Sequence, residues 1–167
     1  MIKKSDKQLL LEVQLDWLSD TKGVLSANDA KEVTGTIRVG THPQLGGDGE
    51  PWSAQHLFLG AINSCVMSTY LSLAEKHHLD TSHFVCNSIG EVQMVDGKYR
   101  LVNINLYPKV YIIEEAKQNK AEQVLQEACQ NSMIINAVNT DVFFHGEVLI
   151  DPHPRFGQSS IHSNFVA

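Results

Sequence analysis

Residues 56–79, HLFLGAINSCVMSTYLSLAEKHHL, constrain the fold most strongly, because their apolar side chains recur at helical spacing. The spacing i, i+3, i+4, i+7 predicts a helix buried along a wide face. Cys65 falls in the middle of that face, and Ser53 is a suitable N-cap ahead of the helix. Small residues are frequent on the helix, so another element can approach its backbone closely. The apolar positions are 57, 58, 61, 62, 65, 66, 70, 73 and 74.

The segments around this helix read as strands and turns. Three short stretches before it carry apolar residues at period two, which predicts an antiparallel meander (residues 9–18, 24–29 and 32–40). A loop at 40–52 contains four glycines and two prolines, which argues against regular structure there. Asp96-Gly97 joins two further strands and is a strong hairpin signal.

A second helical pattern covers residues 114–137, with a break expected at Asn131-Ser132 before a short turn at 133–138, and a last strand covers 141–150. The order is therefore β-β-β-α-β-β-α-β. Because strands come in hairpins, the predicted class is α+β, with antiparallel sheets around a central buried helix that bears Cys65.

Length and charge limit the number of domains and the classes of binding partner. The 167 residues suit one domain, which we place at 1–150, followed by a polar tail at 151–167. The net charge of −6 and the lack of a basic cluster argue against nucleic acid as a partner. Glu12, Gln14 and Asp16 interrupt the first apolar stretch, so it does not read as a signal peptide. No uninterrupted apolar run reaches membrane-spanning length, and we expect a cytoplasmic protein without a membrane partner.

The number and spacing of the three cysteines do not by themselves indicate a disulfide framework, a metal site or a reactive thiol. Cys65, Cys86 and Cys129 are widely spaced and odd in number, unlike a secreted disulfide framework. No pair has zinc-binding spacing, and we expect neither a metal nor a cofactor. Taken alone, each thiol reads as a small core residue. A reactive Cys65 would need a cation from another element, because it lies about three turns into its own helix. The histidines at 42, 56 and 145 read as structural, with His56 at the helix start the one to test.

The loop and helix together resemble the OsmC/Ohr family (osmotically induced protein C and organic hydroperoxide resistance protein). In GTHPQLGGDGEPWSAQHLFLGAINSC, a proline- and glycine-rich loop precedes a helix whose cysteine lies eight positions past a leucine and follows a small residue. These residues are Leu57, Ser64 and Cys65. A second family cysteine matches Cys129 in CQNSMIINAV, with Ser132 three residues on. The resemblance extends to about Ile150.

The resemblance implies a thiol peroxidase in oxidative stress defence. Cys65 would attack the O–O bond of a hydroperoxide, become a sulfenic acid and condense with Cys129 to a disulfide, which a dithiol reductant would reset. An apolar pocket would favour organic hydroperoxides, because an alkyl tail gains about 25 cal/mol per Å² buried. The resemblance also implies an intertwined homodimer with both helices central and two active sites at the interface.

The chain departs from the family pattern around the thiol. Gln55 stands where the family has a glutamate that holds an activating arginine. The N-terminal turn offers Lys22 instead, and Arg38 is the only arginine before the loop. Glu50 is a candidate substitute for the missing carboxylate. Two alternatives stay open: a catalytically weak or inactive member that binds a small apolar ligand in the same pocket, and a thiol redox or thioester-handling enzyme that uses Cys65 alone.

Overall fold

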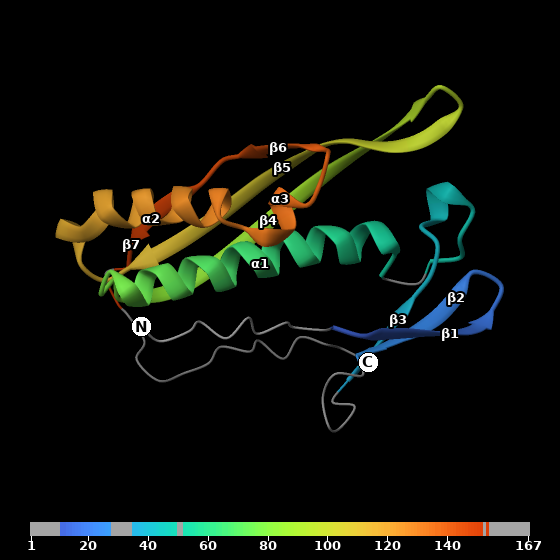
Figure 1. Cartoon of the computed structure of the whole chain (residues 1–167), viewed down its shortest axis with the longest axis horizontal. Coiled ribbons are helices and arrows are strands. Elements are labelled where there is room, and N and C mark those ends of the chain that lie inside the picture. Colours follow the sequence, from blue (N-terminus) through green and yellow to red (C-terminus); the bar gives the residue numbers. More distant parts are fainter. Residues whose placement is uncertain (1–10, 28–34, 50–51, 152, 154–167) are drawn as a thin grey trace, which may run out of the picture. The chain divides into compact units, whose positions relative to one another are not determined.

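The computed structural model describes residues 11–27, 35–49, 52–151 and 153. The chain forms two compact units, Met1–Phe58 and Leu59–Ala167 (Figure 1). The predicted α+β class is confirmed. The first unit holds a small sheet and the second a larger mixed sheet with helices.

The first unit is built on the predicted three-stranded meander. Strands β1 (Val13–Ser19), β2 (Lys22–Ala27) and β3 (Thr36–Val39) pair antiparallel in that order. The expected strand residues 9–10, 28–29 and 32–34 lie outside the described part of the chain. The loop that we expected to lack regular structure contains one 3-10 turn, η1 (Pro43–Leu45). His42 caps this turn by accepting a hydrogen bond from the Gln44 N–H, and Pro43 suits its first position.

Helix α1 (Ala54–Lys76) confirms the predicted helix but begins two residues earlier and ends three residues earlier. Ser53 caps it as predicted, because its hydroxyl accepts from the His56 N–H. The buried face is narrower than predicted and consists of Ile62, Val66, Tyr70 and Ala74. Sequence periodicity cannot show how much of an apolar surface a neighbour covers, and Met67 and Leu71 are exposed in the single chain.

Length and composition would allow α1 to cross a membrane, and it is the one helix among the described residues that meets these criteria. One such helix is weak evidence, because the core helix of a soluble domain meets them too.

The sheet of the second unit is dominated by a long hairpin. Strands β4 (Thr81–Val95) and β5 (Lys98–Ile112) pair antiparallel along their whole length. The turn falls at Asp96-Gly97 as predicted, with φ of 51° and 75°. Positive φ at both positions is what a type I′ turn requires, and glycine adopts it without steric cost.

Residues 141–150 were predicted as a single last strand, but they form two strands, and their pairing makes this sheet mixed rather than purely antiparallel. Two short strands, β6 (Asp141–Phe144) and β7 (Glu147–Ile150), each pair parallel to β5. The gap between them falls opposite Pro108, which has no N–H to donate to a ladder. The pairing is parallel because the chain crosses over through helices between β5 and β6.

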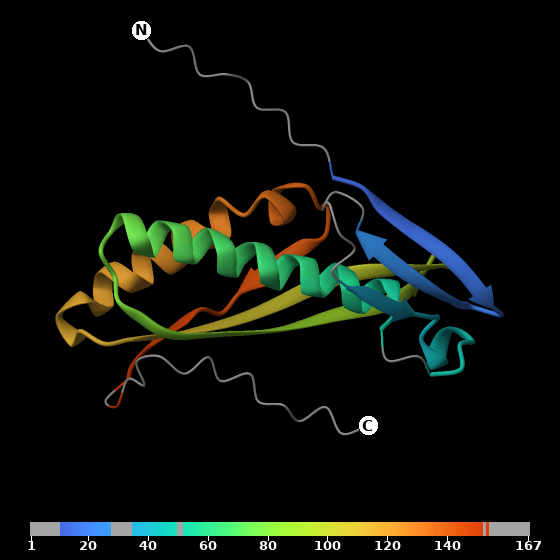
Figure 2. The same cartoon turned by 90° about the horizontal axis from the view of Figure 1, so that it is seen from below.

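Two helices follow the hairpin. A 3-10 turn, η2 (Glu115–Lys117), leads into α2 (Gln118–Gln130), and α3 (Met133–Asn136) follows the predicted break at Asn131-Ser132. Within the second unit, α1 and α2 lie on the same face of the sheet (Figure 2). The core between them is apolar and is formed chiefly by Tyr70, Ala74, Val110, Ile112, Ala121, Val124, Leu125, Ala128 and Val148.

Candidate functional site

The thiol of Cys65 meets the beginning of α3. Ser132 is the N-cap of α3, and its hydroxyl accepts a hydrogen bond from the Ile135 N–H at 3.4 Å. The same hydroxyl and the backbone N–H groups of Met133 and Ile134 donate toward the sulfur of Cys65. The first N–H groups of a helix have no partner within the helix, so α3 offers them to the thiol.

These donors change the acidity of Cys65. Burial by itself raises the pKa of the thiol, but hydrogen bonds from Ser132, Ile134, Met133 and the Thr69 hydroxyl outweigh it. The net result is a pKa below the ordinary thiol value, because each donor stabilises the thiolate. We expected a cation from another element to provide this stabilisation. The donors that lower the pKa of Cys65 are neutral groups of α3 and of Thr69 on α1 itself, and the expectation of a cation stays a prediction.

Thr69 and Ser68 hold the backbone around the thiol. The Thr69 hydroxyl lies 2.8 Å from the Cys65 carbonyl oxygen, and the Ser68 hydroxyl lies 3.1 Å from the same atom. Cys65 itself is half-buried, so a small reagent can reach the sulfur. The side chain therefore combines a stabilised thiolate with access, which are the two properties of a reactive cysteine.

Cys129, the predicted resolving thiol, lies near the end of α2 and is 8% exposed. Its burial raises its pKa, so it rests as a neutral thiol. Its carbonyl oxygen accepts a hydrogen bond from the Ser132 N–H at 3.3 Å. Backbone geometry thus ties Cys129 to the residue whose hydroxyl contacts Cys65.

Cys86, which we treated as packing, is half-buried on β4. Burial and the nearby Cys129 raise its pKa to about 11. Its thiol donates to Asn63 Oδ1 at 3.3 Å, and Asn63 Nδ2 donates back to the Cys86 carbonyl at 3.3 Å. The thiol is thus held neutral.

The four candidate activating residues belong to the first unit. Lys22 forms an ion pair with Asp48 at 2.7 Å, and this pairing lowers the pKa of Asp48. Arg38 lies on β3 with an exposed side chain. Gln55 is exposed in the first turn of α1, and Glu50 lies outside the described residues. Their role in activating Cys65 stays a prediction.

His42, His56 and His145 each have a hydrogen-bond partner. His56 Nδ1 lies 3.0 Å from Ser53 Oγ and accepts from the Ser53 N–H at 3.3 Å, which makes it the reciprocal partner in a capping box. His42 caps η1. His145 Nε2 lies 3.0 Å from Asn105 Oδ1, and its ring stacks on Tyr107 with centroids 4.6 Å apart.

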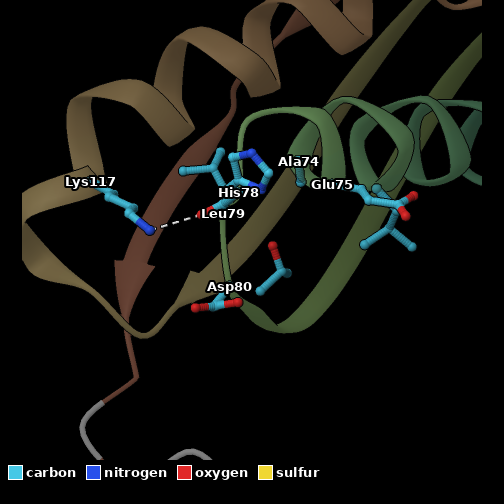
Figure 3. Close-up of a pocket in the computed structure, with 8 residues that line it drawn as sticks. Ala74, Glu75, His78, Leu79, Asp80 and Lys117 are labelled. Carbon is cyan, nitrogen blue, oxygen red and sulfur yellow. Dashed lines mark hydrogen bonds between the residues drawn. The ribbon is translucent and has the colours of Figure 1, made fainter.

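Each unit also has a cavity. A cavity of about 400 Å³ in the first unit is lined mainly by apolar side chains, among them Leu15, Trp17, Leu25, Val39 and Leu57. A cavity of about 510 Å³ in the second unit lies where α1 ends. Figure 3 shows Lys117 reaching toward the backbone of His78 there, with Nζ 2.8 Å from the carbonyl oxygen. The second cavity contains no cysteine.

No group of three or more His, Cys, Asp or Glu that could hold a metal ion occurs among the residues described, 11–27, 35–49, 52–151 and 153.

The donors to Cys65 were missed at the sequence level. Ser132 stood in the motif quoted for the second cysteine, and Thr69 lies one helical turn after Cys65. Thr69 lies on the same helix as Cys65, and Ser132 becomes a hydrogen-bond partner of the Cys65 sulfur once α3 lies next to α1. Backbone N–H groups leave no residue signature, so Met133 and Ile134 gave no signal.

The fold and the thiol site define an α+β protein with a hydrogen-bonded cysteine on its long helix. The sequence model of the OsmC-like protein family matches residues 47–145, and the chain belongs to this family. Comparison with curated proteins gives no significant match.

Solved structures share the fold at low sequence identity. An OsmC-like protein of unknown function from Vibrio cholerae is 18% identical with a TM-score of 0.72, covering 83% of this chain and 99% of its own. An organic hydroperoxide resistance protein from Elizabethkingia anophelis is 13% identical with a TM-score of 0.66, covering 87% and 99%. An organic hydroperoxide resistance protein OsmC from Legionella pneumophila is 16% identical with a TM-score of 0.63, covering 84% and 97%.

Proposed function

We propose that this chain reduces organic hydroperoxides with Cys65 as the nucleophile and Cys129 as the resolving thiol, in defence against oxidative stress. The observation that carries the proposal is the half-buried Cys65 thiol, whose pKa is lowered by the donors at the start of α3. Family membership and structural neighbours named as organic hydroperoxide resistance proteins support it.

The reaction divides into balanced steps. The Cys65 thiolate attacks the terminal oxygen of R–O–OH, the O–O bond breaks, and the alkoxide takes a proton and leaves as an alcohol. The resulting Cys65 sulfenic acid condenses with the Cys129 thiol, forming a disulfide and releasing water. A dithiol reductant then reduces the disulfide and restores both thiols. The Met133 and Ile134 N–H groups stabilise the thiolate before attack.

A homodimer in the cytoplasm forms part of the proposal. Large apolar side chains are exposed in each unit, including Trp17 at 74% and Leu11 at 68% in the first and Met133 at 67% in the second. Exposed apolar surface of this kind is typical of an interface. A second copy of the chain would cover it and would complete the family's two-site arrangement.

Thiol counting on the reduced protein tests the function. With cumene hydroperoxide in stoichiometric amount, the wild type is expected to lose two thiols as one Cys65–Cys129 disulfide. Cys65→Ser should abolish the reaction, and Cys129→Ser should accumulate a sulfenic acid that dimedone traps. Ser64→Ala, at an exposed neighbouring position on α1, is the matched control and should behave as wild type.

Two outcomes would redirect the proposal. If no thiol is lost even at millimolar peroxide, the chain is not a peroxidase, and the member that only binds an apolar ligand becomes the better account. If Cys65 reacts but Cys129 never forms a disulfide with it, the enzyme uses Cys65 alone.

A separate experiment concerns the cations. Replacement of Lys22 and Arg38 by glutamine, one at a time, shows which of the two, if either, contributes to the rate of peroxide reduction.

A further inference from the structure

Asn63 lies on the side of α1 that faces the sheet. One turn before it, the Leu59 side chain packs on Gly90 of β4, where an added Cβ would come within 3.2 Å of the leucine. Two turns after it, the Tyr70 ring lies 5.8 Å from the ring of Phe84, which is also on β4. Spacings of four and seven residues keep side chains on one face of a helix, so Asn63 lies between two contacts with the same strand.

Asn63 forms two hydrogen bonds with Cys86 of β4. The Cys86 thiol donates to Asn63 Oδ1, and Asn63 Nδ2 donates to the Cys86 carbonyl oxygen, both at 3.3 Å. The register partner of Cys86 on β5 is Pro108, which has no N–H to give to that carbonyl. Asn63 therefore supplies a donor that this partner cannot. Because the amide is bound at both of its ends, the contact fixes the height of this turn of α1 over β4 and its rotation about the helix axis.

Cys65 lies in the same turn of α1 but on its other side. An α-helix turns about 100° and rises about 1.5 Å per residue, so a side chain two positions after Asn63 points about 200° away from it. Figure 2 shows α3 on the side of α1 that faces away from β4. This turn of the helix thus meets the sheet through Asn63 and the start of α3 through Cys65.

The position of α3 is set by α2. The Ser132 N–H donates to the Cys129 carbonyl oxygen at 3.3 Å, and Asn136 Nδ2 donates to the Gln130 carbonyl oxygen at 2.9 Å. Cys129 and Gln130 are the last two residues of α2. These bonds hold α3 against α2 without involving α1. The distance between the Cys65 sulfur and α3 therefore depends separately on how α3 sits on α2 and on how α1 sits on β4.

We propose that Asn63 is a positioning residue for Cys65, which holds this turn of α1 where the thiol meets the first N–H groups of α3. The inference takes the role of Cys65 as the nucleophile from the proposed function. Asn63 acts through the placement of the helix rather than by contact with the reacting sulfur.

Loss of the contact should let this turn of α1 shift on the sheet and lengthen the hydrogen bonds to the Cys65 sulfur. Hydrogen bonds weaken steeply when their geometry is distorted, and the thiolate depends on these donors more than the neutral thiol does. The thiolate fraction at neutral pH should therefore fall, by about two- to threefold, because the donors are displaced rather than removed.

The pH profile of Cys65 alkylation by iodoacetamide tests the proposal. Cleavage after lysine and arginine places Cys65 on peptide 39–76, which mass spectrometry can quantify. In Asn63→Ala the midpoint is expected to move to higher pH by about 0.3–0.5 unit. Cys86→Ser keeps a hydroxyl that can donate to Asn63 Oδ1 and should stay close to the wild type. If Asn63→Ala does not fold, Asn63→Leu, which has a similar volume and no hydrogen-bonding group, carries the same expectation.

Tyr70→Phe is the matched control. The Tyr70 hydroxyl lies 3.2 Å from Thr81 Oγ1 and forms another side-chain hydrogen bond between α1 and β4, two turns beyond Asn63. Its removal should lower the free energy of unfolding, as loss of the Asn63 contact does, but leave the midpoint of Cys65 alkylation unchanged. Urea denaturation of both variants provides the comparison of stabilities.

An unchanged midpoint in the Asn63 variant would overturn the proposal, because Asn63 would then contribute to stability alone. An equal shift in Tyr70→Phe would overturn it too, because any loosening of α1 would then have the same effect. Alkylation uses no peroxide, so this result is separate from the thiol-counting test. A protein that loses no thiol to peroxide but shows the shift lacks the proposed function and retains the positioning role of Asn63.

Discussion

Removal of the Ser132 hydroxyl is expected to make Cys65 a weaker acid. The hydroxyl is fully buried and has one proton, and it accepts the Ile135 N–H while it donates toward the Cys65 sulfur. Acceptance of one hydrogen bond orients the hydroxyl for the other. In Ser132→Ala the thiolate loses one donor, whereas the neutral thiol loses little, so the pKa rises.

The size of the effect follows from the energy of a hydrogen bond to a charged group. Such bonds contribute about 1.5–3 kcal/mol, and screening at the half-buried sulfur reduces the figure to about 1 kcal/mol. That energy corresponds to a roughly fivefold smaller thiolate fraction at neutral pH. Alkylation slows by less, about twofold, because a more basic thiolate is also a better nucleophile.

The decisive measurement is the pH profile of Cys65 alkylation by iodoacetamide, with the modified peptide quantified by mass spectrometry. The midpoint is expected to move to higher pH in Ser132→Ala. Ser132→Thr keeps a hydroxyl and should retain a profile close to wild type. Ser68→Ala removes a hydrogen bond to the Cys65 backbone but none to the sulfur, and it controls for general loosening of α1.

Loss of the α3 cap accompanies the same change and has to be separated from it. An N-cap serine contributes about 1 kcal/mol, so urea denaturation should show a small loss of stability in Ser132→Ala. The reasoning is refuted if that loss appears while the alkylation midpoint stays where it is in the wild type. Stability would then depend on the hydroxyl, and the acidity of Cys65 would not.

Two further predictions concern stability. The pKa of Cys86 rises from 9.0 to about 11 on folding, so the free energy of unfolding should fall as pH increases from about 9 to about 11, where only the unfolded thiol ionises. The full pKa shift corresponds to about 2.7 kcal/mol, and partial exposure of Cys86 reduces this contribution to about 1–2 kcal/mol. The free energies of unfolding of wild type and Cys86→Ala, measured by urea denaturation, should therefore approach each other by that amount across this pH range. Separately, Ser53→Ala should lower the free energy of unfolding by about 1 kcal/mol, because it removes the N-cap of α1. His56→Gln should change it by no more than about 0.5 kcal/mol, because glutamine also completes a capping box. Equal losses in the two variants would contradict the capping role.

The elements that the sequence predicted well are those governed by local chemistry. The Asp96-Gly97 hairpin follows from two residues that tolerate positive φ. Helix α1 follows from its periodicity, and its start from Ser53. The break before α3 follows from Asn131-Ser132, which favour backbone conformations outside a helix.

The errors arose where the partner is distant in sequence. Pro108 was visible, but nothing local showed that β6 and β7 would flank it in parallel. The width of the buried face of α1 depends on what covers the helix, which periodicity does not encode. The pKa of Cys65 depends on N–H groups that belong to every residue type, so composition could not point to them.

The source of the lowered pKa of Cys65 changes how Gln55 is interpreted. At the sequence level, the absence of a glutamate there left the activation of the thiol open, because the resemblance assigned activation to an arginine that the glutamate would hold. In the structure, the donors that lower the pKa of Cys65 lie at the start of α3 and at Thr69, and Gln55 is not among them. Thiolate formation and substrate binding are therefore separable requirements. If Lys22 or Arg38 serves the reaction, we expect it to act on the developing charge of the peroxide oxygen, so its replacement should change the rate of peroxide reduction rather than the acidity of Cys65.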